Sequence, residues 1–256
     1  MRRFVTAVLA SVCFLGAGCA SGSQADRAAF DSGYAALEAG RWQEAVDGFT
    51  RYLRSDPTSA HRGEVYYYRG QALVHLNRRT EAKTDFVRAI GAEPRPPIDQ
   101  FVRVAIGNLY YEEGSDVKAI EHYTKVISDP DKDVPVPSVL LRIGVSLQRL
   151  GKWSLADSYL GHLVEKYPGT PSAGQALRRL HADAFRVQTG AFASMTTAAR
   201  QAQQVRAAGF ETRLGRTSKG GQALSTVQVG RAGTYAEAAV LAQRVRQAGF
   251  ETLIVP

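Results

Sequence analysis

Cysteine is scarce in this sequence of 256 residues. The only two, Cys13 and Cys19, both lie near the N-terminus. Cleavage of an export signal before Cys19 removes the first of them, and a chain with one cysteine cannot form an internal disulfide. A fold held together by disulfides is therefore excluded. A hydrophobic core must stabilise the protein instead, and 45% of its residues are apolar.

Groups of catalytic residues are also missing. The five histidines lie between residues 61 and 181, and no two have the spacing of a zinc motif. Residues 184–256 contain only three acids, Glu211, Glu237 and Glu251, whereas a glycosidase needs two carboxylates that flank a cleft. No glycine-rich phosphate loop is present. We therefore expect a binding protein and not an enzyme, with no metal and no cofactor.

The N-terminus has the layout of an export signal. Two arginines precede an apolar run from Phe4 to Leu15, which is too short to span a bilayer, and small residues lead to Cys19. This layout resembles a bacterial lipoprotein signal, although Gly16 stands where that family usually has leucine. The resemblance implies a signal over residues 1–19, lipidation of Cys19 and, because Ala20 follows, sorting to the outer membrane. The alternative is an ordinary cleaved signal with a chance cysteine.

Residues 26–184 repeat with a period of 37. Each unit has a glycine, then an alanine twelve positions later, then a bulky apolar residue four positions after that. This pattern resembles the tetratricopeptide repeat, which implies an all-α helical solenoid of four units, with a capping helix from Ser172 to about Ala184. Trp42 and Trp153 occupy matching places, and we expect both to fill gaps between helices. The repeating residues are Gly33, Gly70, Gly107, Gly144; Ala45, Ala82, Ala119, Ala156; Phe49, Phe86, Tyr123 and Leu160.

Stacked repeats of this kind form a hollow lined by the first helix of each unit. The resemblance implies a lining that is rich in tyrosine and suits an extended or helical peptide. We therefore expect an unidentified protein partner, although the hollow can also be a mere by-product of stacking. The expected lining residues are Tyr34, Leu37, Tyr67, Gln71, Asn108, Tyr111, Val145 and Gln148.

The C-terminal region contains two copies of one sequence unit. Val187-Gln188-Thr189-Gly190 recurs as Val227-Gln228-Val229-Gly230, and the Gly-Phe-Glu-Thr run from Gly209 recurs from Gly249. Each copy predicts strand, helix, strand, with apolar and polar residues alternating along the strands. We expect an α+β domain with a four-stranded antiparallel sheet and both helices on one face. Nine Lys/Arg against three acids give residues 184–256 a net charge of +6, which favours a polyanion, anionic lipid or the cell wall as partner.

This C-terminal region, residues 185–256, resembles the sporulation-related repeat (SPOR) domain in its Val-Gln-Thr-Gly and Ala-Gly-Phe motifs. The resemblance implies binding of peptidoglycan, with a preference for glycan strands that lack stem peptides. Ala232 departs from the family, whose second half often has an aromatic residue there. RNA-binding folds share the layout, but the expected open face lacks aromatics and the signal directs export. The expected glycan-binding residues are Arg186, Gln188, Gly190, Phe192, Arg213, Thr226 and Gln228.

Together these patterns predict a non-catalytic envelope scaffold. The C-terminal sheet would hold the wall, with enrichment at the division septum, while the repeats hold a protein partner and Cys19 holds the outer membrane. One alternative is an adaptor for outer-membrane protein assembly in which the repeat hollow does the work. A wall-degrading enzyme is a third class, for which the sequence offers no catalytic set.

Overall fold

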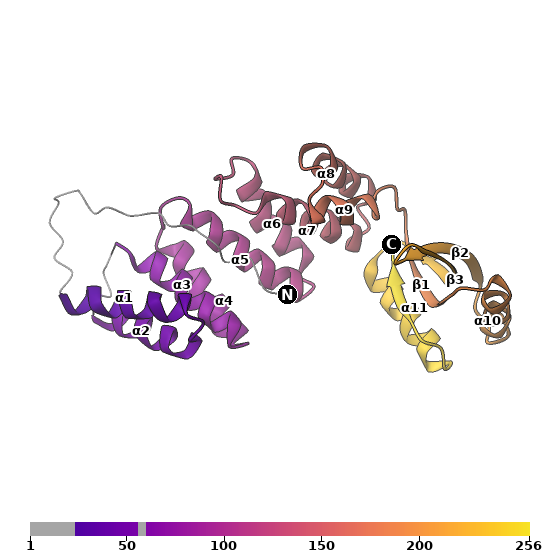
Figure 1. Ribbon diagram of the computed structural model, residues 1–256, viewed down its shortest axis with the longest axis horizontal. Coiled ribbons are helices and arrows are strands. Elements are labelled where there is room, and N and C mark those ends of the chain that lie inside the picture. The colour runs from indigo at the N-terminus through magenta and orange to yellow at the C-terminus, as the bar shows by residue number, and fades with distance from the viewer. Residues whose placement is uncertain (1–23, 56–59) are drawn as a thin grey trace.

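The computed structural model describes residues 24–55 and 60–256, so the signal over residues 1–19 and the lipidation site Cys19 lie outside the described residues. The described chain forms a helical array followed by a C-terminal α+β domain at one end of it (Figure 1). The helices of the array are α1 (Gln24–Glu38), α2 (Trp42–Ser55), α3 (Arg62–His75), α4 (Arg79–Gly91), α5 (Ile98–Glu112), α6 (Asp116–Ile127), α7 (Val136–Arg149), α8 (Trp153–Lys166) and α9 (Pro171–Leu177).

The repeating glycines allow the two helices of each unit to pack closely. A Cβ added at Gly107 would lie 2.7 Å from the ring of Tyr123, and one added at Gly70 would lie 2.5 Å from the ring of Phe86. Gly144 faces Leu160 in the same way. Each bulky residue comes sixteen positions after its glycine, so the repeat in the sequence is a repeated contact between helices.

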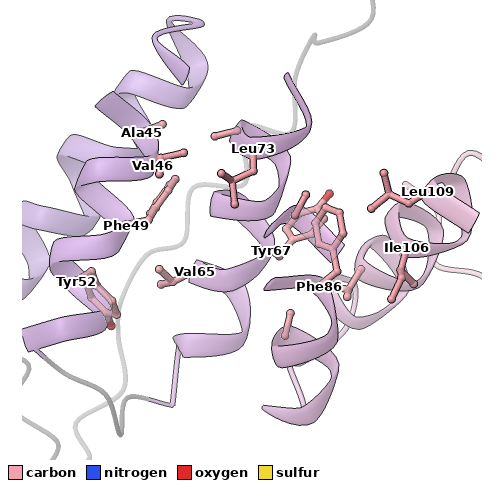
Figure 2. Close-up of a cluster of buried hydrophobic side chains, with 14 of the residues drawn as sticks. Ala45, Val46, Phe49, Tyr52, Val65, Tyr67, Leu73, Phe86, Ile106 and Leu109 are labelled. Carbon is pink, nitrogen blue, oxygen red and sulfur yellow. The ribbon is translucent and has the colours of Figure 1, made fainter. Parts of the chain in front are cut away.

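Successive units pack mainly through the second helix of one unit and the first helix of the next, as α2 packs on α3, α4 on α5 and α6 on α7. Helices α1, α3, α5, α7 and α9 contact one another in sequence, whereas the second helices of neighbouring units make no comparable contacts within the described residues. The first helices therefore form the inner row of the stack and the second helices the outer row. Figure 2 shows the core between units, where Phe49 and Tyr52 of α2 lie across from Val65 of α3.

Helix α9 is shorter than expected and ends at Leu177, not near Ala184. Thr170 caps its N-terminus by accepting a hydrogen bond from the Ala173 amide. The chain then turns through His181, whose φ of 62° is left-handed and incompatible with a continuing helix. The turn delivers the chain to the first strand of the C-terminal domain.

The C-terminal domain has the predicted α+β layout. Its sheet is antiparallel with strand order β2-β3-β1-β4. Both helices cover one face, where Val187, Val229, Val205 and Val245 form the core. A capping box starts the second helix, because Thr234 and Glu237 each accept a hydrogen bond from the other's backbone N–H. The elements are β1 (Phe185–Phe192), α10 (Met195–Ala207), β2 (Thr212–Lys219), β3 (Gln222–Ala232), α11 (Tyr235–Gln247) and β4 (Leu253–Val255).

Trp153 joins the array to the C-terminal domain. Its indole Nε1 donates a hydrogen bond to the Gly233 carbonyl oxygen at 2.9 Å, and its ring centroid lies 5.0 Å from that of Phe185. The expectation that both tryptophans fill gaps between helices of the array is therefore wrong for Trp153. Trp42, at the matching place, stacks on His75 of the next unit at 3.9 Å. The difference arises because the last unit has the C-terminal domain as its neighbour.

The same contact explains the unusual Ala232. In the first half of the domain, Phe192 packs against a cluster that includes Ala198. In the second half, Ala232 and Ala238 occupy the equivalent places, and Trp153 packs against their cluster. The array thus supplies the aromatic ring that the second half of the domain lacks.

Candidate functional site

The sheet face opposite the two helices carries a row of residues that crosses all four strands. Arg213 of β2 pairs with Gln228 of β3, which pairs with Gln188 of β1, which pairs with Leu253 of β4. Arg213 and Leu253 are exposed, and the two glutamines are half-buried. The row therefore offers one cation, two amides and an apolar end to a ligand that lies across the strands.

A second arginine lies on this face near the array. Arg186 is two positions before Gln188 on β1, and its guanidinium lies 3.6 Å from the Asp183 carboxylate. Arg231 donates to the same carboxylate at 2.9 Å, and this hydrogen bond lowers the pKa of Asp183. Among the residues that the structure describes, Arg213 makes no ion pair, so its charge is available to a ligand.

Three of the expected glycan-binding residues are not exposed on the open face as predicted. Thr226 is on the open face, yet it is only 1% exposed and its hydroxyl has no hydrogen-bond partner. Gly190 does not open space for a ligand, because a Cβ there would lie 2.5 Å from the ring of Phe192. Phe192 itself packs on the helix side of the sheet, against Ala198 and Val227. For Gly190 and Phe192 the correction follows from a register irregularity after Gln188 in β1, whereas Thr226 is covered at Gly215 of the neighbouring strand.

The loop after β3 is in contact with the array. The carbonyl of Gly233 accepts the Trp153 hydrogen bond, and a Cβ at Gly151 would lie 3.0 Å from the same oxygen. The contact lies at the ends of β1 and β3 and on the helix side of the sheet. It therefore leaves the Arg213–Leu253 row uncovered.

The expected hollow of the array is only partly open. Tyr34, Leu37, Gln71, Asn108 and Tyr111 are half-buried on the inner helices. Tyr67, Val145 and Gln148 are buried, so their expected place on an open wall is wrong. The buried side-chain amide of Gln148 donates to the Arg179 carbonyl at 2.9 Å, because α9 packs over the end of α7.

Residues that sequence reasoning missed lie beside Tyr111. The guanidinium carbons of Arg142 and Arg149 stand 5.1 and 4.4 Å from the centroid of its ring. The two arginines are seven positions apart and therefore lie on the same face of α7. This signal was available in the sequence. Nothing local, however, showed that α5 would bring an aromatic ring between them.

Helices long and apolar enough to cross a membrane are absent from 24–55 and 60–256. The same part of the chain contains no cluster of His, Cys, Asp and Glu that could hold a metal ion.

Residues 182–256 match the SPOR domain family, and residues 27–59 and 138–170 match the tetratricopeptide repeat family. No curated protein matches the sequence. The SPOR domain is a peptidoglycan-binding domain, and tetratricopeptide repeats are protein-interaction modules. The family matches therefore assign one binding class to each part of the chain.

Solved structures resemble the array. A tetratricopeptide repeat protein from Parabacteroides merdae is 16% identical with a TM-score of 0.54, over 61% of this chain and 59% of that one. MamA AMB-1 is 20% identical with a TM-score of 0.51, over 60% and 78% of the two chains. Pseudomonas aeruginosa PilF is 19% identical with a TM-score of 0.50, over 59% and 64%. The chain thus spans less than two thirds of the Parabacteroides protein and of PilF, and the likeness shows the fold alone. The family matches identify a chain in which a tetratricopeptide-repeat array precedes a C-terminal SPOR domain, and the SPOR domain indicates a cell-envelope protein.

Proposed function

We propose that this protein is a non-catalytic scaffold that binds peptidoglycan glycan through the open sheet face and a protein partner through the inner helices of the array. The observation that supports the glycan site is the uncovered row of Arg213, Gln228, Gln188 and Leu253 across the sheet. Cys19 would tether the scaffold to the outer membrane, and enrichment at the division septum would follow from a preference for stripped glycan.

The chemistry of the row suits glycan without stem peptides. Removal of a stem peptide leaves a free carboxylate on the lactyl group of the sugar. A guanidinium such as that of Arg213 binds a carboxylate through two parallel hydrogen bonds. The amides of Gln188 and Gln228 can both donate to and accept from hydroxyl and N-acetyl groups. Leu253, 59% exposed, offers apolar contact beside them.

Co-sedimentation of the mature protein with sacculi tests this proposal. We expect more binding to amidase-treated sacculi than to intact ones. A Gln188→Ala/Gln228→Ala double variant should lose about tenfold in affinity, since each amide contributes hydrogen bonds of roughly 0.5–1.5 kcal/mol.

The matched control is Gln203→Ala/Gln243→Ala. These exposed glutamines also stand at equivalent places in the two halves, but on the helices α10 and α11. Equal losses in the two double variants, or no gain after amidase treatment, would contradict the proposed site. Release of muropeptides from the sacculi would contradict the non-catalytic assignment.

The membrane tether has its own test. A Cys19→Ser variant should move from the membrane fraction to the soluble fraction, because the acylated residue is lost. Cell fractionation and immunoblotting measure this change. Unchanged membrane partition would remove Cys19 from the proposal and leave the wall-binding part untouched.

A further inference from the structure

An unusual group of cations lies on the inner helices beside the SPOR domain. Arg142 and Arg149 of α7 flank the ring of Tyr111 of α5. Arg179, which follows α9, donates to the Gln148 side chain at 3.1 Å. Tyr235, the first residue of α11 in the SPOR domain, stands 5.7 Å from the Arg149 guanidinium. We call Tyr111, Arg142, Arg149, Arg179 and Tyr235 the junction cluster.

The junction cluster has too few acids to balance it. Asp116, 3.3 Å from Arg149, makes the only ion pair to these arginines among the described residues. Arg142 instead donates to the Asn108 side-chain oxygen at 2.5 Å and to the Tyr123 hydroxyl at 3.5 Å. Partial burial of cations is unfavourable unless anions compensate them.

The electrostatics of Arg179 show the same imbalance. Burial lowers the pKa of its guanidinium, Tyr111 opposes this effect, and the nearby charges of Arg149 and Arg178 lower that pKa further. The arginines nevertheless keep exposed surface, since the Arg149 side chain is 26% exposed. With Asp116 as the single paired acid among the described residues, their charge is therefore only partly compensated, and it is within reach of a ligand.

From this imbalance we infer that the junction cluster binds an acidic segment of a protein partner, an inference that rests on the proposed role of the array. Charge complementarity supports this occupant, because residues 135–256 carry fifteen Lys/Arg and six acids. Carboxylates of the segment pair with Arg142 and Arg149, while Tyr111 and Tyr235 contact its apolar parts. A segment seated there contacts both parts of the chain.

The location of the cluster favours a peptide over glycan. Four of its five residues belong to the array, and Tyr235 lies on a helix that covers the face of the sheet opposite the glycan row. A glycan chain on the Arg213–Leu253 row does not reach that side of the sheet.

Fluorescence anisotropy with the mature protein tests the inference. The probes are a fluorescein-labelled glutamate-rich peptide and the same peptide with glutamine at each glutamate. We expect only the acidic peptide to bind, and less tightly as salt screens the charges. Arg142→Gln should weaken binding about tenfold, the range for a hydrogen bond to a charged group.

The matched control is Arg200→Gln, which removes an equal charge from an exposed position on α10. Equal losses in the two variants, or equal binding of the two peptides, would overturn the inference. Displacement of the acidic peptide by soluble stripped glycan or by vesicles of anionic lipid would also overturn the inference. Loss of peptide binding when the protein dimerises would overturn it as well.

Two further readouts separate this inference from a structural role and from the glycan proposal. If Arg142 only stabilised the fold, Arg142→Gln would lower the urea midpoint and leave peptide affinity unchanged, which would also overturn the inference. We expect the urea midpoint to stay level or rise because repulsion is relieved. Binding of Arg142→Gln to amidase-treated sacculi should equal that of the wild type, so a failure of the glycan proposal appears in that assay alone.

Discussion

At the scale of single residues, His122 on α6 is set apart by its environment. Its Nδ1 is buried without a hydrogen-bond partner, and its ring stacks on that of Tyr110 at 5.7 Å. Burial lowers the pKa of this imidazole, Lys125 and Arg103 lower it further, and Glu121 opposes them. Folding therefore favours neutral His122.

This pKa shift makes stability depend on pH. In the unfolded chain, His122 binds a proton once the pH falls below its ordinary pKa of 6.5. In the folded chain, His122 stays neutral until the pH falls to the lowered pKa. The contribution of His122 to stability is thus largest above 6.5 and is lost as the pH falls. We expect His122→Gln to show a smaller drop in urea midpoint than the wild type between about pH 7.5 and about pH 5.

The exposed His162 on α8 gives the control for this prediction. His162→Gln should keep the pH dependence of the wild type. If His122→Gln does so as well, burial of the ring does not set the slope.

Residue types at single positions also show where prediction from sequence ends. The alternation of Gln188 and Gln228 with valines correctly predicted which side chains face away from the helices. Thr226 obeys the same alternation, yet it lies against Gly215 of the neighbouring strand and is buried. Periodicity predicts the face on which a side chain lies, but its exposure depends on the neighbours across the strands.

At the scale of elements, the array depends on helix pairs that meet at a glycine. Gly107 lies against the ring of Tyr123, which is fully buried and whose hydroxyl donates to Asn108 at 2.7 Å. The ring is rigid and held at both ends, so it cannot move aside for a methyl group. The helical pattern was predictable because such contacts repeat every 37 residues.

Gly107→Ala should therefore lower the free energy of unfolding by about 1–3 kcal/mol through overpacking. Urea unfolding followed by circular dichroism at 222 nm, the usual helix signal, measures the change. Gly161→Ala in the middle of α8 meets no atom within 4 Å and should raise stability by roughly 0.5–1 kcal/mol from helix propensity. Similar effects of the two substitutions would show that the close helix contact at Gly107 is unimportant.

The inner wall of the array was harder to predict from the sequence. The family pattern placed Val145 and Gln148 on an open surface, but α9 covers the end of α7 and buries both. Which wall positions stay open depends on how the last unit is capped. That is a tertiary contact between segments some thirty residues apart, as the hydrogen bond from Gln148 to Arg179 shows.

At the scale of the whole molecule, Trp153 fixes the SPOR domain to the array. It completes the apolar cluster around Ala232 and Phe185 and donates to Gly233. The junction could not be predicted from either repeat pattern, because each describes contacts within its own part of the chain.

Trp153→Ala should loosen this junction. We expect a larger radius of gyration by small-angle scattering and faster proteolysis between α9 and β1, since the variant loses a partly buried ring and a hydrogen bond. Trp42→Ala removes the matching tryptophan of the first unit and should leave both measurements at the junction unchanged. Equal effects of the two variants would mean that the domains are held together by something other than Trp153.

The missing ring at position 232 has a consequence for how such proteins can be recombined. A SPOR domain that brings its own aromatic there would collide with Trp153 if it were transplanted behind this array. Conversely, this domain without the array would expose the apolar surface around Ala232 that the Trp153 indole covers. Exchange of the two modules between proteins therefore requires paired changes, one at Ala232 in the domain and one at Trp153 in the array.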